Sequence, residues 1–259
     1  MSSLERYFEA YARLYDPLID WDHREPFEKI LWRRILERWP ATTALDCACG
    51  TGFHVQLMTR LGVRTFGCDF SRAMIERARE RTRESSCPLD FRVLRWEQMA
   101  AEYAHPFDMV ICAGNSLAYV ESKAARARAV DQMLACVRPG GTFVVECLNY
   151  ERLVEEKPPF LPGFHHERED GAKLDIGYVL TYREGAVAMH LFLVNESGGN
   201  VTDRMNHVRT YTVLREPFAD YLRRAGCVDV QFFSGDIDSL VVFDEARDRH
   251  WYCVAVKGS

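Results

Sequence analysis

Short apolar runs alternate with amphipathic segments along the middle of the chain. The apolar runs at 44–48, 65–69, 91–96, 107–114 and 142–149 predict strands, and the segments at 55–61, from Ser71 onward and at 123–137 have helical spacing. Each predicted strand is nearly continuous in apolar residues, which is typical of strands covered on both faces. The pattern therefore predicts an α/β fold with a doubly wound, mostly parallel sheet.

The period changes after Asn149. The stretch 151–172 is rich in proline and charge and predicts an irregular connection. From Lys173 onward the period becomes two, with apolar or aromatic residues alternating at 174–182 and 187–193. Positions 207–213 mark a third candidate strand, and glycines lie between the three, which predicts an antiparallel meander. A helix at 217–225 and strands at 228–233 and 251–256 then resume the first pattern. We therefore expect a seven-stranded sheet with an antiparallel insertion after the fifth strand.

The first 40 residues predict two helices. Phe8, Tyr11, Leu14 and Tyr15 form one apolar face, and Pro17 should end the first helix before a second at 26–39. This segment precedes the first strand, so it lies outside the alternating pattern.

Composition narrows the class of protein. The chain has 259 residues, of which 47% are hydrophobic and 27% charged, which excludes disorder, collagen and coiled coil. No apolar run reaches the roughly 18 residues of a membrane helix, and the charged first residues do not resemble a signal peptide. A net charge of -5 argues against a nucleic-acid partner. We expect a soluble, cytoplasmic protein that binds neither nucleic acid nor membrane.

Nine cysteines are scattered along the chain without a C-x-x-C pair. Cys47, Cys68, Cys112, Cys147 and Cys253 fall in the predicted strands, where a free cysteine acts as a small apolar residue. The cysteine pattern therefore indicates a reducing compartment, with neither a disulfide framework nor a metal site.

The residues after the first predicted strand indicate a ligand site. In a doubly wound sheet, ligands bind beyond the carboxyl end of this strand, where strand order reverses. Gly50 and Gly52 allow a sharp turn and close approach of the backbone to a ligand. Asp69 ends the second predicted strand at the offset where an acidic residue accepts hydrogen bonds from ribose hydroxyls. An adenosine-containing ligand is the simplest interpretation.

Two missing features restrict that ligand. A dinucleotide site needs a third glycine where Val55 stands, and no Lys or Arg lies near the turn to neutralise a phosphate. S-adenosylmethionine, which has adenine and ribose but no phosphate, fits both absences.

Four segments carry a resemblance to a known family. The runs ALDCACGTG, FGCDFSRAMIERAR, FDMVICAGNSLAYV and VRPGGTFVVECLNY, in this order, resemble the class I S-adenosylmethionine-dependent methyltransferases. The chain is similar more narrowly to the glycine N-methyltransferases and relatives that methylate small amines and amino sugars. The resemblance covers residues 8–150 well. It implies a Rossmann-like methyltransferase fold whose last strand is antiparallel.

The resemblance also implies roles for individual residues. Tyr15 and Arg24 would reach the methionine tail from an N-terminal lid, and Asp69 would bind the ribose. The other implied cofactor contacts are Ala48, Gly50 and Gly52 at the first turn, Phe70, Met74 and Trp96 around the adenine, and Ala113 and Gly114 beside the methyl group. The polar atoms nearest the acceptor would come from Asn115, Tyr15, Tyr119 and Tyr150, and His165 or His166 is a candidate to take a proton.

One position departs from the family pattern. Glycine N-methyltransferases have an arginine two positions before a tyrosine, and this arginine binds the carboxylate of glycine. Here Tyr150 is present but Leu148 stands in place of the arginine. Because leucine cannot bind a carboxylate, we expect an acceptor larger and less acidic than glycine.

We therefore expect methyl transfer to a small-molecule amine by in-line displacement. A small-molecule O-methyltransferase and a non-enzymatic S-adenosylmethionine-binding regulatory module are the alternatives. The expected organisation is a helical lid at 1–40, a cofactor-binding core at 41–150, a substrate-binding insertion at 151–214 and the end of the core sheet at 215–259. The meander is also a candidate contact between subunits, so we expect a homo-oligomer.

Overall fold

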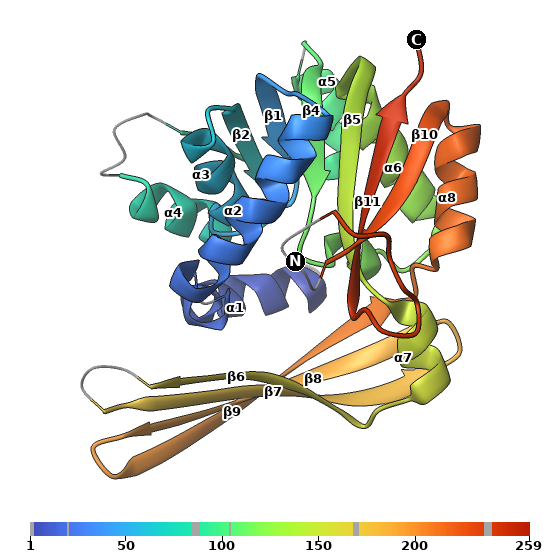
Figure 1. Cartoon of the computed structure of the whole chain (residues 1–259). Coiled ribbons are helices and arrows are strands. Elements are labelled where there is room, and N and C mark those ends of the chain that lie inside the picture. The colour runs from blue at the N-terminus through green and yellow to red at the C-terminus, as the bar shows by residue number, and fades with distance from the viewer. Residues whose placement is uncertain (1–2, 20, 84–88, 104, 168–170, 236–239) are drawn as a thin grey trace.

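The computed structural model describes residues 3–19, 21–83, 89–103, 105–167, 171–235 and 240–259. Its central sheet has seven strands in the order β10-β11-β5-β4-β1-β2-β3 (Figure 1). The strands are β1 (Thr43–Asp46), β2 (Arg64–Asp69), β3 (Asp90–Val93), β4 (Phe107–Cys112), β5 (Val137–Leu148), β10 (Cys227–Ser234) and β11 (His250–Lys257). Only β11 runs antiparallel to its neighbours, β5 and β10. The predicted seven-stranded, mostly parallel sheet and its antiparallel last strand are confirmed.

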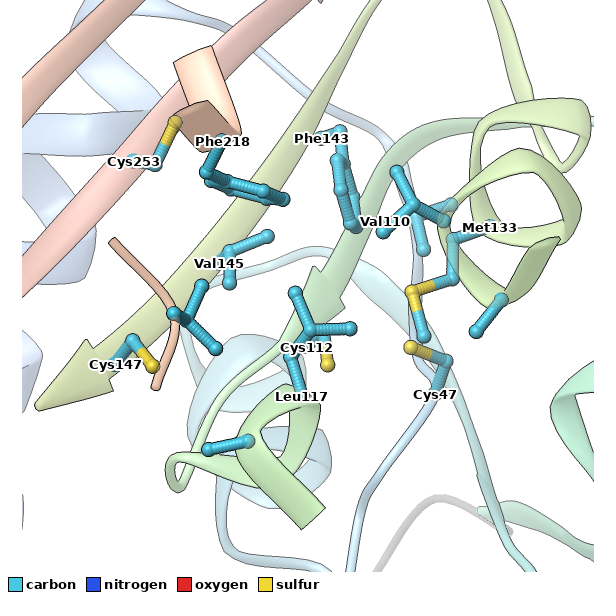
Figure 2. Packing of buried hydrophobic residues seen from close by; sticks show 14 of the residues in the cluster. Cys47, Val110, Cys112, Leu117, Met133, Phe143, Val145, Cys147, Phe218 and Cys253 are labelled. Carbon is cyan, nitrogen blue, oxygen red and sulfur yellow. The ribbon is translucent and has the colours of Figure 1, made fainter. Parts of the chain in front are cut away.

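Helices cover both faces of this sheet. Helices α2 (Trp21–Arg38), α3 (Phe53–Arg60) and α4 (Arg72–Arg81) lie on one face, and α5 (Met99–Glu102), α6 (Lys123–Ala135) and α8 (Arg215–Arg224) lie on the other. Figure 2 shows Met133 of α6 and Phe218 of α8 near Val110 of β4 and Phe143 and Val145 of β5. Burial on both faces explains the continuous apolar runs of the strands.

The cysteines assigned to strands are part of this core. Cys47, Cys68, Cys112, Cys147 and Cys253 are all buried and free, and burial raises the pKa of the Cys47, Cys68, Cys147 and Cys253 thiols. Figure 2 shows four of them among aliphatic and aromatic side chains. They pack as small apolar residues, as predicted.

The N-terminal helices are longer than the sequence indicated. Helix α1 (Ser3–Ile19) continues through Pro17, and α2 begins at Trp21 and includes Pro26. The prediction that Pro17 ends the first helix is therefore wrong by two residues. A proline close to a helix end removes at most one backbone hydrogen bond, a cost that packing can offset. None of the helices in the described part of the chain is long and apolar enough to cross a membrane.

The insertion contains more regular structure than predicted. The stretch 151–172, expected to be irregular, instead includes most of helix α7 (Tyr150–Glu156) and strand β6 (Phe160–Glu167). Strand β6 is an edge strand whose register shifts between Pro162 and His165. An edge strand tolerates proline because one side of its backbone needs no ladder partner. Proline therefore obscured this strand in the sequence.

Strand β6 joins the predicted meander to make a second sheet. Its order is β6-β7-β8-β9, with β7 (Lys173–Arg183), β8 (Ala186–Ser197) and β9 (Asn200–Tyr211), and all its pairs are antiparallel. Its inner face buries Leu174, Ile176, Leu191 and Leu193 against Ala12 of α1 and Met74 of α4. Helix α1 thus lies between the insertion sheet and the core, near the carboxyl ends of the parallel strands (Figure 1).

Candidate functional site

A cavity of about 870 Å³ lies at the carboxyl ends of the parallel strands, between the central sheet, α1, α2 and the insertion. Strand β1 stands between β2 and β4, so the chain crosses to either side from this point. Such a switch point leaves a crevice beyond the strand ends. Ala48 and Gly50 follow β1, Asp69 ends β2, and Gly114 follows β4, and all four line the cavity.

Most of the residues predicted to form the site do line this cavity. They are Tyr15, Arg24, Ala48, Gly50, Asp69, Phe70, Met74, Trp96, Gly114, Asn115 and Tyr119. Residues from both N-terminal helices and from the carboxyl ends of three strands are therefore brought together. Gly52, Ala113 and Tyr150 are not among the lining residues.

Gly52 and Ala113 have packing roles instead of places in the cavity wall. Gly52 adopts a φ of 91°, and a Cβ added there would lie 2.8 Å from Cζ of Phe91. The position thus needs glycine both for its backbone conformation and for the aromatic ring above it. Ala113 is buried in the core cluster beneath α2 and α3. Sequence spacing alone did not distinguish these inward-packed positions from cavity-facing ones.

The turn after β1 is joined to the end of β2 by Asp69. Its Oδ2 accepts the Gly50 N–H at 3.0 Å, and its Oδ1 accepts the Ser71 N–H at 2.8 Å. Burial raises the pKa of Asp69 to about 6, although these two N–H groups act in the opposite direction. Each carboxylate oxygen retains a second lone pair, so both can accept hydroxyl groups from the cavity side.

Apolar and aromatic side chains form the wall beside β2 and β3. Phe70 contacts Phe8 of α1 edge to face, with ring centroids 5.5 Å apart, and Met74 is fully buried behind them. Trp96 donates its indole N–H to the Cys47 carbonyl at 2.6 Å, which fixes the ring at the cavity edge. This wall provides flat apolar surfaces suited to an aromatic base.

Tyr15 of α1 covers the turns after β1 and β4. A Cβ added to Gly50 would lie 3.1 Å from Cε1 of Tyr15, and one added to Gly114 would lie 3.8 Å from its hydroxyl oxygen. Burial raises the pKa of Tyr15 well above its usual value. The hydroxyl is therefore protonated at neutral pH and can orient a ligand without acting as a phenolate.

The side chain of Asn115 is held from behind. Its Nδ2 donates to the hydroxyl of Tyr150 at 2.9 Å, and its Oδ1 accepts the Leu148 N–H at 3.3 Å and the Cys147 thiol at 3.0 Å. Asn115 also has the left-handed φ of 58° that starts the 3-10 turn η2 (Ser116–Tyr119).

These contacts change two predicted roles. Tyr150 is fully buried and is not among the residues that line the cavity, and its hydroxyl accepts from Asn115, which does line it, so the prediction that Tyr150 lies beside the acceptor is wrong. Tyr150 positions Asn115. Because Oδ1 of Asn115 already accepts two hydrogen bonds, this oxygen is not available to orient an N–H group of a substrate.

A buried carboxylate that the sequence analysis missed anchors α2. Glu28 Oε1 accepts from Arg24 at 2.6 Å, and its Oε2 lies 2.8 Å from the Trp32 indole nitrogen and 3.1 Å from Nε2 of His54. The hydroxyl of Tyr252 on β11 donates to the same oxygen at 3.4 Å. Burial disfavours ionisation, but Arg24 and His54 hold the pKa of Glu28 well below its usual value.

Glu28 had a weak sequence signal. Arg24, Glu28 and Trp32 are spaced four residues apart, so they follow one face of a helix. The partners His54 and Tyr252 come from distant segments. His54, the second residue of α3, thus belongs to this buried hydrogen-bond group.

A second missed carboxylate, Glu146 of β5, lines the cavity directly. It is buried, accepts the backbone N–H of Gly114, and pairs with Tyr252 across the β5-β11 ladder. Leu148, two residues further along the strand, also lines the cavity. The position where glycine N-methyltransferases would have an arginine is therefore in the cavity wall and is apolar.

The outer part of the cavity is walled by the insertion. Leu161, Tyr178, Met189 and Val208 come from its four strands and face Tyr119 of η2. Burial raises the pKa of Tyr119 well above its usual value, so this hydroxyl also stays protonated. The wall is mainly apolar with a few tyrosine hydroxyls.

Histidine positions in the insertion are poor candidates for the site. His165 is exposed and pairs with Asp175 at 2.7 Å outside the cavity, which contradicts its predicted role as a proton acceptor. The side chain of His166 lies outside the described part of the structure. Among the residues that the structure describes, no group of three or more His, Cys, Asp and Glu side chains is placed to hold a metal ion.

Comparison with known proteins is consistent with this geometry. Residues 44–141 match a family described as "Methyltransferase domain". A glycine/sarcosine N-methyltransferase of Parasynechococcus marenigrum is 30% identical over 151 residues, covering 58% of this chain and 54% of the relative. A ubiquinone biosynthesis O-methyltransferase of Xanthomonas campestris is 36% identical over 110 residues, or 42% and 44% of the two chains. The chain thus spans about half the length of the curated relatives it matches.

Solved structures match nearly the whole chain. Streptomyces venezuelae DesVI superposes with a TM-score of 0.75 at 19% identity, covering 96% of this chain and 98% of the other. CalS10, an amino pentose methyltransferase from Micromonospora echinaspora bound to S-adenosylmethionine, gives 0.71 at 20% identity over 94% and 96%. These likenesses show that the complete fold is shared, including the antiparallel insertion.

Removing the Glu28 carboxylate should destabilise the protein strongly. Glu28→Ala leaves Arg24, Trp32 and His54 without their buried acceptor, so we expect a loss of about 3 kcal/mol in the free energy of unfolding. Glu37→Ala on the same helix removes an exposed ion pair and should cost less than about 0.5 kcal/mol. Urea unfolding of both variants measures the difference, and equal small losses would contradict the structural role of Glu28.

Binding of S-adenosylhomocysteine should depend on the ionisation of Asp69. Ribose hydroxyls would donate to the ionised carboxylate, and burial raises the pKa of the unliganded residue to about 6. Affinity should therefore rise as pH increases through about 6 and fall as Asp69 is protonated below it. Asp69→Asn should bind weakly and lose this dependence.

Calorimetric titration between pH 5 and pH 8 measures this effect. Asp46→Asn is the matched control, because burial also raises the pKa of Asp46 to about 6 and this residue is not among the lining residues. A pH dependence that persists in Asp69→Asn and disappears in Asp46→Asn would show that the wrong carboxylate was identified.

Proposed function

We propose that this chain, which carries a class I methyltransferase domain with S-adenosylmethionine as its cofactor, transfers a methyl group to the amine nitrogen of a small molecule. The observation that carries this proposal is the pairing of two features in one cavity. The inner half has the carboxylate and aromatic surfaces that an adenosine needs, and the outer half has an apolar wall built by the insertion sheet, beside which Arg249 and the Arg152-Glu156 pair also line the cavity.

The residues present fit the cofactor. Asp69 has lone pairs free for two ribose hydroxyls, and Phe70, Met74 and Trp96 provide apolar surfaces for the adenine. Arg24 lies further along the cavity, where a guanidinium can bind a carboxylate. Gly50 keeps the turn after β1 free of a side chain beneath Tyr15. Across the sheet from β3 toward β5, the assigned positions run from the adenine through the ribose to the methionine tail.

When bound, S-adenosylmethionine would supply a methyl group carried on a sulfonium. A neutral nucleophile would attack the methyl carbon in line and displace the sulfur. The protein's part is then to hold the nucleophile about 3 Å from the methyl carbon and to exclude water. Tyr15 and Tyr119 keep their protons at neutral pH, so their hydroxyls orient the acceptor. A neutral amine can attack without prior proton removal and lose its proton to solvent afterwards, so the reaction needs no strong base in the site.

The nature of the wall favours an amine without a nearby carboxylate. Leu148 stands where a carboxylate-binding arginine would be, and Leu161, Met189 and Val208 extend the apolar surface. Several similar proteins are named as N-methyltransferases or as methyltransferases of amino sugars, which supports nitrogen as the acceptor. The O-methyltransferase relatives make an oxygen acceptor the second candidate.

The same reasoning extends to the two segments outside the core. Helices α1 and α2 supply Phe8, Tyr15 and Arg24 to the cavity and would act as its lid. The insertion supplies most of the outer wall and would determine which acceptor fits. The core at 41–150 would then carry the chemistry shared by the family.

Amines without a carboxylate should be methylated and glycine should not. We expect incubation with S-adenosylmethionine and a panel of alkyl amines, amino sugars, glycine, sarcosine, phenols and thiols to yield N-methyl products only from the amines that lack a carboxylate. Mass spectrometry identifies both the methylated atom and the number of methyl groups. Products methylated on oxygen would favour the second candidate, and cofactor binding without any product would favour a regulatory module.

The outer face of the insertion sheet would pair two copies of the chain. Phe160, Val179, Val201 and Met205 are between 39% and 66% exposed on this face, and Phe160 stacks on Phe192 at 5.7 Å. We expect the protein to sediment as a dimer and Met205→Glu to shift it to a monomer. Val228→Glu on β10, which is 75% exposed, is the control and should remain dimeric. A wild-type monomer would refute this assignment.

A further inference from the structure

Opposite charges meet where α2, β5 and β11 reach the cavity. Arg24 and Glu146 both line it, and Glu146 faces Tyr252 directly across the β5-β11 pair. Tyr15 and Tyr252 also line this cavity, so four side chains from α1, α2, β5 and β11 contribute to its wall. This region lies beside Gly114, whose backbone N–H binds Glu146.

Arg24 is already paired with another carboxylate. Arg24 pairs with Glu28 through its Nε and Nη2 atoms, and Glu28 is further bound by Trp32 and His54. Glu146 adds a second carboxylate, and its hydrogen bond within the described residues comes from a neutral backbone N–H. Because Arg24 is held by Glu28, the buried Glu146 carboxylate in the cavity wall favours a ligand that brings a positive charge.

We propose that Glu146 binds the α-ammonium group of the cofactor's methionine portion while Arg24 binds its carboxylate. In an α-amino acid a single carbon separates these two groups, so the anion and the cation that bind them must line the same cavity, as Glu146 and Arg24 do. The pair then recognises the zwitterion by charge-assisted hydrogen bonds. This inference rests on the proposed function, because it assumes the same cofactor.

The position of Glu146 on β5 supports this assignment. Glu146 lies on the face of the sheet covered by α2, with Ala113, Val144 and Tyr252, whereas Cys147 points to the opposite face. Arg24 comes from α2 on the same face. Both charged groups therefore approach the cavity from one side, and the tyrosine and apolar wall of the insertion lies across it.

Two ligands that differ only in the amino-acid portion provide the test. S-adenosylhomocysteine has the zwitterion, and methylthioadenosine has the same adenosine and sulfur but no amino-acid group. Glu146→Gln keeps an oxygen for the Gly114 N–H and removes the charge. We expect Glu146→Gln to lower the affinity for S-adenosylhomocysteine about 10- to 100-fold. Its affinity for methylthioadenosine should stay within about twofold of wild type, as measured by calorimetry.

Further variants distinguish recognition from a structural effect. Arg24→Met should show the same selective loss, and Glu155→Gln, an exposed carboxylate on α7 outside the cavity, should bind both ligands as wild type does. Retained methylthioadenosine binding also reports that each variant is folded. Glu146→Asp keeps the charge on a shorter side chain, so its affinity for S-adenosylhomocysteine should lie between those of Glu146→Gln and wild type.

The outcomes separate this inference from the proposed function. If wild type binds neither ligand, the proposed function fails. If wild type binds S-adenosylhomocysteine and Glu146→Gln binds it equally well, the inference fails alone, and Glu146 would then serve the acceptor amine. Equal weakening of both ligands would show a structural role and would also overturn the inference.

Discussion

The buried hydrogen bonds of Glu28 are the constraint on which the candidate site depends. This one carboxylate joins Arg24 and Trp32 of α2 to His54 of α3 and Tyr252 of β11. A carboxylate held among four donors in a buried position is stabilised only if every donor stays in place. Helix α2 is thereby fixed to α3 and β11, although it belongs to no strand-helix unit of the core.

That attachment gives the cavity its two halves. The core contributes the turn after β1 and the Asp69 carboxylate, which are joined by the Gly50 N–H. The fixed helix α2 presents Arg24, and α1 is held between the insertion sheet and α4 so that Tyr15 covers the turns. Under the proposed function, Tyr15 and Arg24 would both contact the cofactor and close the cavity over it.

Acceptor choice would depend on a different set of residues. Asn115 is held by Tyr150, Leu148 and Cys147, so the inner edge of the acceptor region is rigid. The outer wall comes from four strands of the insertion. Along these strands, side chains point alternately to the inner face and to the exposed outer face. Substitutions on that inner face can change the shape of the chamber without disturbing Asp69 or Gly50, since these belong to the central sheet. A division of this kind allows one cofactor site to serve many acceptors.

The sequence by itself determined the local and periodic features. It predicted the seven strands, the antiparallel insertion, and most residues of the turn-and-aspartate site, because apolar periodicity and glycine spacing act over short stretches of chain. It missed β6, where proline masks an edge strand, and it placed Tyr150 beside the acceptor and His165 near the site. Only the tertiary structure decided the partners of Glu28, the exposure of Glu146 to the cavity and the position of Tyr150 behind Asn115. These depend on contacts between segments up to 224 residues apart, such as Glu28 with Tyr252, and no local pattern encodes which distant side chain a buried polar group will meet.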